Sequence, residues 1–337
     1  MVEELRGRLY STVVGSFPFK VDKALMGEND WSRVTEIRET SFRALGLQLG
    51  AGIEFPSDGQ FFDMVDMYLQ PLMEAGFLKK DRSFGEGELP KAHPATTLES
   101  LLEALAKKSE GLGLRVPITG PFTLGYRVKT GGKSLMEAGD SAGVLRLADA
   151  VKTYSMGFDR VLRGSILSID EPVLPFVLPV FGENFVREVL NAIFERIKRN
   201  YSCMHVCGAV KSLKGLALSL DVEILDHEFQ GTDNRDLYTK KELIEHEKLL
   251  SYGLINTNPK QVFPKEGAVL VESVAHIKDS LRAACKTYGV ENLLVSPDCG
   301  FGGWRHLRIP EDEKWGYIKE KLSNMVRARE EYLAEVH

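Results

Sequence analysis

Apolar and β-branched residues gather in eight short runs that recur along the whole chain. Most of these runs are followed by a Gly, Pro or Asn turn and then by a stretch with helical periodicity. The runs cover residues 8–17, 47–59, 114–121, 164–172, 201–208, 222–230, 249–258 and 291–301. Strands that alternate with helices form parallel sheets, and eight repeats favour a closed barrel over an open sheet. The pattern predicts an α/β fold, a (β/α)8 TIM barrel.

Apolar residues at three- and four-residue spacing mark the helices expected to cover this barrel. The spacing is clear in residues 183–200 and 273–289, and residues 311–337 have the pattern of a long terminal helix. These segments follow predicted strands or end the chain, as the outer ring of a barrel requires.

The segment 61–113, after the second predicted strand, is too long for a simple βα connection. It contains two helical patterns, at 62–76 and 97–109, joined by a polar linker. We expect one catalytic barrel domain over residues 1–337, with a helical insertion at about 61–113.

Polar side chains lie at the carboxyl ends of the predicted strands. They are Ser16, Glu54, Asp58, Thr119, Asp170, His205, Glu228, Asn256 and Asp298. Barrel enzymes build their active sites at this face, so we expect an enzyme with its chemistry there.

The bulk composition excludes several classes of function. The 337 residues are 43% hydrophobic and 27% charged, with a formal net charge of −5. This balance gives no electrostatic reason to bind nucleic acid or an anionic membrane. No apolar run approaches the roughly 18–20 residues that span a bilayer, and the charged start MVEELRGRLY lacks the apolar core of a signal peptide. We expect a cytoplasmic protein.

The four cysteines are Cys203, Cys207, Cys285 and Cys299. In a reducing cytosol, so few cysteines in a long chain indicate metal ligands, nucleophiles or buried thiols rather than disulfides. Cys285 lies in a helical pattern and Cys203 lies deep in its predicted strand, so we expect both in the core. Cys207 and Cys299 lie at strand ends, where the chemistry of a barrel is found.

His205 and Cys207 are two residues apart on a predicted strand, so their side chains point to the same face. Cys299 ends the eighth run, and a closed barrel brings all strand ends to one central space. Zinc accepts two cysteines and a histidine together with a fourth ligand, and thiolates favour zinc over magnesium or calcium. The sequence predicts a Zn²⁺ site at His205, Cys207 and Cys299.

The sixth run supplies the fourth candidate ligand. Asp226 and Glu228 share one face of the strand, and His227 takes the other. We favour Glu228 because it lies nearer the strand end and reaches further, with Asp226 as the alternative.

The motifs that contain these candidate ligands resemble those of a known family. HVCG at 205–208 and SPDCGFGG at 296–303 are similar to the zinc-binding C-terminal barrel of cobalamin-independent methionine synthase. Four further segments fit in the same order. They are VVGSFPF at 13–19, GIEFPSDGQFFDM at 52–64, ITGPFTL at 118–124 and SIDEPVL at 168–174. The resemblance covers nearly the whole chain.

The resemblance implies a zinc-dependent methyltransferase that activates the thiol of homocysteine and transfers a methyl group to it, giving methionine. It assigns His205, Cys207, Glu228 and Cys299 as zinc ligands. It also implies that Asp170 is catalytic and pairs with the homocysteine ammonium group, and that Val14, Gly15, Ser16 and Gln60 bind the same substrate.

The chain departs from the full-length family enzymes in ways that bear on the methyl donor. It has the length of one barrel, and it carries Gln60, Tyr126 and Asn256 where those enzymes carry glutamate, tryptophan and, nearby, histidine. It resembles more closely the short single-barrel members of archaea and some bacteria. The resemblance implies a donor that is a methylcorrinoid, delivered by a corrinoid protein, or methyltetrahydrofolate.

Three other functions fit parts of the pattern. A zinc methyltransferase for another small thiol, of the coenzyme M type, would not use Asp170, because such thiols have no ammonium group. A metal-free enzyme like uroporphyrinogen decarboxylase would need basic strand ends, and these are acidic and thiol-bearing. A zinc-storage protein would not need a deep cup.

Overall fold

The structure, a computed structural model, describes residues 2–28, 30–89, 96–109, 113–263 and 269–336. Within these residues the main sheet has six parallel strands in the order β1-β4-β5-β6-β7-β8. The strands are β1 Arg115–Thr119, β4 Ile166–Asp170, β5 Tyr201–Val206, β6 Ile224–His227, β7 Leu249–Ile255 and β8 Leu293–Pro297. All their residues are buried, as expected for parallel strands that are covered on both faces.

Two short segments close the ring between β8 and β1. Residues 11–12 pair with β8 on one side and with Phe55 on the other, and Ser57 pairs with β1. Backbone hydrogen bonds follow the same path, from Thr12 N to the Val295 carbonyl at 2.9 Å and from Phe55 N to the Ser11 carbonyl at 3.0 Å. Eight strand positions therefore form a (β/α)8 barrel, and the predicted fold class is confirmed.

Each predicted run contains one strand position, but the second run is wrong at its start. Residues 47–50 belong to helix α1, Thr35–Gly50. The buried residues of α1 follow helical spacing, and the last of them is Gln48. The Gln48 side-chain amide donates from Nε2 to the Ser57 carbonyl at 3.1 Å and accepts at Oε1 from Ser57 N at 2.7 Å. The apolar run 47–59 thus joins the end of a helix to a strand.

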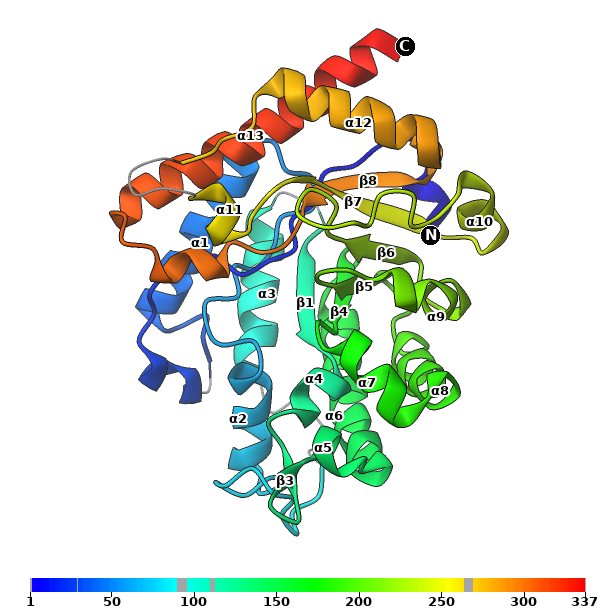
Figure 1. Cartoon of the computed structure of the whole chain (residues 1–337). Coiled ribbons are helices and arrows are strands. Elements are labelled where there is room, and N and C mark those ends of the chain that lie inside the picture. Colours follow the sequence, from blue (N-terminus) through cyan, green and yellow to red (C-terminus); the bar gives the residue numbers. More distant parts are fainter. Residues whose placement is uncertain (1, 29, 90–95, 110–112, 264–268, 337) are drawn as a thin grey trace.

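Helices surround the sheet (Figure 1). The long ones are α1, α2 Asp66–Glu74, α3 Thr96–Lys108, α6 Ser141–Val161, α8 Glu183–Phe194, α12 Val274–Tyr288 and α13 Glu311–Val336. The short ones are α4 Pro121–Gly125, α5 Leu135–Ala138, α7 Leu174–Phe181, α9 Lys214–Ser219, α10 Lys240–Glu245 and α11 Pro259–Val262. The predicted helices at 183–200, 273–289 and 311–337 correspond to α8, α12 and α13. In α8, Val186, Val189, Leu190 and Ile193 are buried at the helical spacing that the sequence predicts.

The segment after the second strand position contains α2 and α3, close to the two predicted helical patterns. Its connecting loop pairs with a small hairpin of β2 Lys129–Thr130 and β3 Lys133–Ser134, through a hydrogen bond from Lys129 N to the Arg82 carbonyl at 3.0 Å. Figure 1 places α2, α4, α5 and this hairpin at one end of the molecule. Residues 90–95 and 110–112 lie outside the described residues. We propose that 61–113 is an insertion in a single barrel domain.

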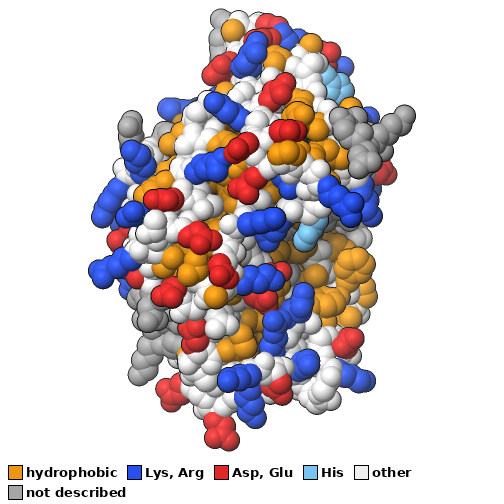
Figure 2. Space-filling view, turned by 90° about the vertical axis from the view of Figure 1, so that its left-hand side faces the viewer, with side chains coloured by type: hydrophobic (Ala, Val, Ile, Leu, Met, Phe, Trp, Pro, Cys, Tyr) orange, Lys and Arg blue, Asp and Glu red, His pale blue; other side chains and the backbone are white. Residues whose placement is uncertain are grey.

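The surface view shows acidic and basic side chains interspersed over one face of the molecule (Figure 2). The small negative net charge of the sequence is therefore not gathered into one strong acidic field on that face. None of the described helices combines the length and apolar character needed to cross a membrane.

Candidate metal centre and active site

Two strands supply the three predicted metal ligands. His205 lies in β5, Cys207 follows the end of β5, and Cys299 follows the end of β8. Between the first two, Val206 points the other way and is fully buried in the core. The alternation of side chains along a strand thus directs His205 and Cys207 together into the barrel mouth.

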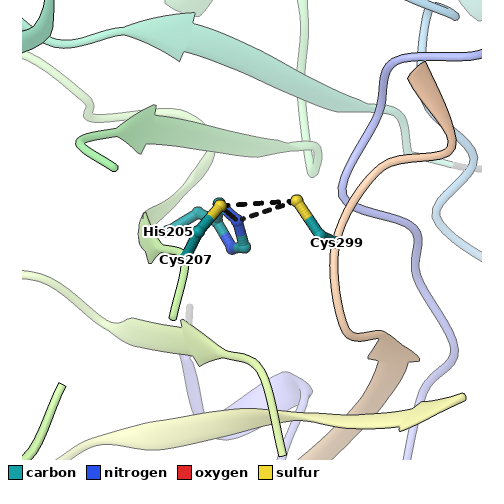
Figure 3. Close-up of side chains that lie close together, drawn as sticks. All are labelled: His205, Cys207 and Cys299. Carbon is teal, nitrogen blue, oxygen red and sulfur yellow. Dashed lines mark hydrogen bonds between the residues drawn. The ribbon is translucent and has the colours of Figure 1, made fainter. Parts of the chain in front are cut away.

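The structure brings these three residues into contact (Figure 3). His205 Nε2 lies 3.0 Å from Cys207 Sγ and 3.7 Å from Cys299 Sγ, and the two sulfur atoms are 3.4 Å apart. His205 is buried, whereas both cysteines are partly accessible. This accessibility leaves one side of the cluster open to a small molecule.

The donor set fits a zinc ion. Zn–S bonds near ~2.3 Å and Zn–N bonds near ~2.0 Å place tetrahedral ligand atoms roughly 3.5–3.8 Å apart. The observed separations are of this size or slightly shorter. Two thiols and an imidazole are soft or borderline ligands, which select zinc over magnesium or calcium.

A buried carboxylate holds the other nitrogen of the histidine. His205 Nδ1 lies 3.0 Å from Asp226 Oδ2, and Asp226 is fully buried. Burial alone would lower the pKa of His205, but Asp226 raises it well above its usual value. With Nδ1 donating to Asp226, Nε2 faces the two sulfur atoms, and once it loses its proton its lone pair can bind a metal.

Sheet register places the polar residues of the site in one row. Asp170 of β4 pairs with His205 of β5, and His205 pairs with Asp226 of β6. Residues paired in register point to the same side of a sheet, so all three side chains enter the barrel. His227 takes the outer face, where its Nε2 lies 3.0 Å from the Tyr238 hydroxyl.

Glu228 and Asp226 lie in different surroundings. Asp226 is engaged by His205 and by the Arg115 guanidinium, both at its Oδ2 atom. Glu228 follows β6 and is half-buried, and burial followed by the charge of Cys299 raises its pKa. Its carboxylate is not part of the close group formed by His205 and the two cysteines. Its backbone is fixed from the next residue onward, because Phe229 N donates to Asp298 at 2.8 Å.

Asp170 is buried at the carboxyl end of β4. The Ser168 hydroxyl donates to its carboxylate at 2.7 Å. Burial raises the pKa of Asp170 to about 6, although His205 and Arg115 act against this shift. An acidic side chain with few fixed donors, next to the thiol cluster, is suited to receive a cation from a ligand.

The segment of Val14, Gly15 and Ser16 lies against the loop that follows Cys299. Gly302 N donates to the Ser16 hydroxyl at 3.4 Å, and a Cβ atom on Gly300 would lie 2.0 Å from Ser16 Oγ. Gly15 has a φ of 119°, and a Cβ atom there would lie 2.9 Å from a side-chain carbon of Pro117. The tight turn therefore needs glycine and holds residues 14–16 beside the cysteine.

Gln60 is buried and has a left-handed backbone conformation, with a φ of 38°. Its Nε2 atom is buried and has no hydrogen-bond partner among the described residues. The same is true of the Oδ1 atom of Asp58, two residues earlier. One buried donor and one buried acceptor that lack partners are the kind of groups that a polar ligand satisfies.

Burial of the Asp58 carboxyl group makes the stability of the fold depend on pH. Burial raises the pKa of Asp58 to about 7, and the charge of Asp170 adds to this shift. Burial and then the charge of Asp58 raise the pKa of the nearby Tyr68. The folded protein therefore keeps a proton between about pH 4 and 7 that the unfolded chain has lost, so stability falls as pH rises through this window.

We expect Asp58→Asn to remove this pH dependence. At pH 8 the variant should be more stable than the wild type by roughly 2–4 kcal/mol, and at pH 4 the two should agree. Urea unfolding of chelator-treated proteins at both pH values measures the difference. An equal gain at both pH values would show that the effect is not electrostatic.

Sequence reasoning did not identify Arg115, and it considered Asp226 only as a metal ligand. Arg115 begins a strand and is fully buried inside the barrel. A charged residue at the start of an otherwise apolar run was the available signal, because a buried arginine needs an anionic partner.

Comparisons with known proteins show which proteins the whole chain is similar to. No protein-family model matches the chain. The methionine synthase of Methanocaldococcus jannaschii is 28% identical over 328 residues, which cover 95% of this chain and 98% of that protein. The methionine synthase of Methanothermobacter marburgensis is 26% identical over 340 residues, covering 96% of this chain and all of that protein.

The chain is similar to methionine synthases along almost its whole length. A solved structure of a B12-independent methionine synthase from Shewanella sp. W3-18-1, in complex with selenomethionine, has the same fold, with a TM-score of 0.68 and 17% identity. The alignment covers 97% of this chain and 98% of that one. This chain is a methyltransferase with a TIM-barrel fold, and it has a possible metal site at its mouth.

Proposed function

We propose that this protein is a zinc-dependent methyltransferase that transfers a methyl group to the thiol of homocysteine and so forms methionine. The observation that carries the proposal is the cluster of His205 Nε2 with the sulfur atoms of Cys207 and Cys299, whose ligand atoms all lie within 4.8 Å. The archaeal relatives named methionine synthase match almost the whole chain. The Shewanella enzyme binds selenomethionine, the selenium analogue of that product.

His205, Cys207 and Cys299 would hold the metal, with Glu228 as the fourth ligand. We prefer Glu228 to Asp226 because Asp226 is already bound to His205 and Arg115. When bound, zinc lowers the pKa of a coordinated thiol, which otherwise is mostly protonated at neutral pH.

The protein itself would bind and orient the amino-acid end of the substrate. The buried carboxylate of Asp170 would pair with the ammonium group, and the buried Gln60 amide, which has no partner among the described residues, would bind the same substrate. The turn at residues 14–16 lies next to Cys299 and would bound the carboxylate end. In the transfer, the thiol loses its proton, its sulfur forms a bond to the methyl carbon, and the bond between that carbon and the donor breaks with its electron pair left on the donor.

The methyl donor is a methylcorrinoid or methyltetrahydrofolate. The matched archaeal proteins have the same single-barrel length as this chain. Gln60, Tyr126 and Asn256 replace residues of the full-length enzymes, and this favours the corrinoid.

Metal analysis followed by parallel assays tests the proposal. We expect about one zinc per chain, and methionine formed from homocysteine with methylcobalamin or with methyltetrahydrofolate. Zinc-loaded protein that makes no methionine from either donor would refute methyl transfer to homocysteine. Protein that binds no zinc at micromolar metal would refute the metal site as well.

A further inference from the structure

A single buried guanidinium lies beneath the candidate metal site. Arg115 begins β1, and its side chain is fully inaccessible to solvent. Its Nη2 atom donates to Asp226 Oδ2 and lies 3.3 Å from the Ser168 hydroxyl oxygen. Its Nε and Nη1 atoms are also buried and have no hydrogen-bond partner among the described residues.

This arrangement is a poor way to stabilise a barrel. Two charges removed from water lose their hydration, and their mutual attraction recovers that loss only when the remaining donors are also satisfied. Here two donor atoms of the guanidinium are unsatisfied. In proteins, apolar side chains of similar volume often replace such a buried pair without loss of stability, so stability alone does not account for the pair.

The contacts of Asp226 indicate what the pair does. Its Oδ2 atom accepts from Arg115 and also lies 3.0 Å from His205 Nδ1, so one oxygen joins the guanidinium to the imidazole. Its Oδ1 atom has a weaker contact, 3.4 Å from the Ser296 hydroxyl. The strongest constraint on the direction of the carboxylate therefore comes from Arg115.

We propose that Arg115 is a positioning residue for the metal centre, which it orients through Asp226. By fixing Oδ2 against Nδ1, it keeps the imidazole turned so that Nε2 faces Cys207 and Cys299. Partners of this kind set the orientation and basicity of a metal-bound histidine. This inference rests on the proposed zinc site.

Zinc affinity, measured by competition with a chelator, tests it without reference to catalysis. Asp226→Asn and Arg115→Met should each bind zinc about 10- to 100-fold more weakly than the wild type. Because Arg115 acts through Asp226, the double variant should bind zinc as weakly as Asp226→Asn and no more weakly. A structural contribution independent of Asp226 would instead add to the loss in the double variant.

Lys248→Met is the matched control. Lys248 is another buried cation, held by the carbonyls of Leu220 and Val222 at 2.6 and 2.8 Å, next to the opposite end of β7. Its loss should lower stability and leave zinc affinity within about 2-fold of the wild type.

The outcomes separate this inference from the proposed function. Wild-type protein that fails to bind zinc would refute both. Wild-type protein that binds zinc, with Arg115→Met binding equally well, would refute the role of Arg115 alone. If the single variants do not fold, the double variant, which leaves neither charge of the pair, is compared directly with the wild type. Unchanged zinc affinity in that variant would equally refute the inference.

Discussion

Replacing Cys299 with alanine should remove bound zinc and methyl transfer while the barrel stays folded. Cys299 follows β8, is partly accessible, and contacts Cys207 and His205. Loss of one of the two thiolate ligands should weaken zinc binding more than loss of a residue that only hydrogen-bonds a ligand. Zinc affinity should therefore fall by more than about 100-fold. The loss should be seen as metal content after dialysis, and methionine formation should fall with it.

Cys285→Ala provides the control. This cysteine is also mostly buried, but it belongs to α12 and lies outside the candidate site. The variant should keep its zinc and its activity, which shows that loss of a thiol is not in itself harmful. Full zinc content in Cys299→Ala would mean that this residue is not a ligand.

Asp170→Asn should lower kcat/KM for homocysteine by roughly 30- to 5,000-fold. Removing one partner of a desolvated charge pair costs about 2–5 kcal/mol, because the other charge is left unpaired. Asparagine has nearly the same shape and can still accept from the Ser168 hydroxyl, which in the wild type donates at 2.7 Å. Zinc content should therefore be unchanged, and the defect should be one of substrate recognition.

A substrate without the amino group makes this prediction specific. 4-Mercaptobutanoate has the thiol and the carboxylate of homocysteine and lacks the ammonium group. The wild type should use it poorly, and Asp170→Asn should use it no worse than the wild type does. An equal loss with both substrates would show that Asp170 acts on the fold or on the chemical step and not on the ammonium group.

Much of the framework was predictable from local patterns. The spacing of apolar runs identified all eight strand positions, because buried parallel strands need short continuous apolar segments. It failed at residues 47–50, where Leu47 and Leu49 end a helix and the apolar run simply continues into the next strand. An apolar run shows that a segment is buried, but it does not show where one element ends and the next begins.

The candidate metal cluster was predictable for a related reason. His205 and Cys207 are two residues apart, and the period of a strand is two, so their shared direction follows from sequence. Their meeting with Cys299 follows from barrel closure, which gathers all carboxyl ends of the strands. No further geometric detail was needed to place these three residues together.

The residues behind the cluster were decided only by the tertiary structure. Which partner faces His205 Nδ1 depends on the register of β5 against β6, which pairs His205 with Asp226. Which cation faces Asp226 depends on how the closed barrel carries Arg115 across its interior from a non-adjacent strand. A strand pattern specifies the face of each side chain, whereas register and closure specify its height and its neighbours. The sequence alone therefore determined the thiols and the histidine, and the closed barrel decided the carboxylate and the guanidinium that hold the histidine in place.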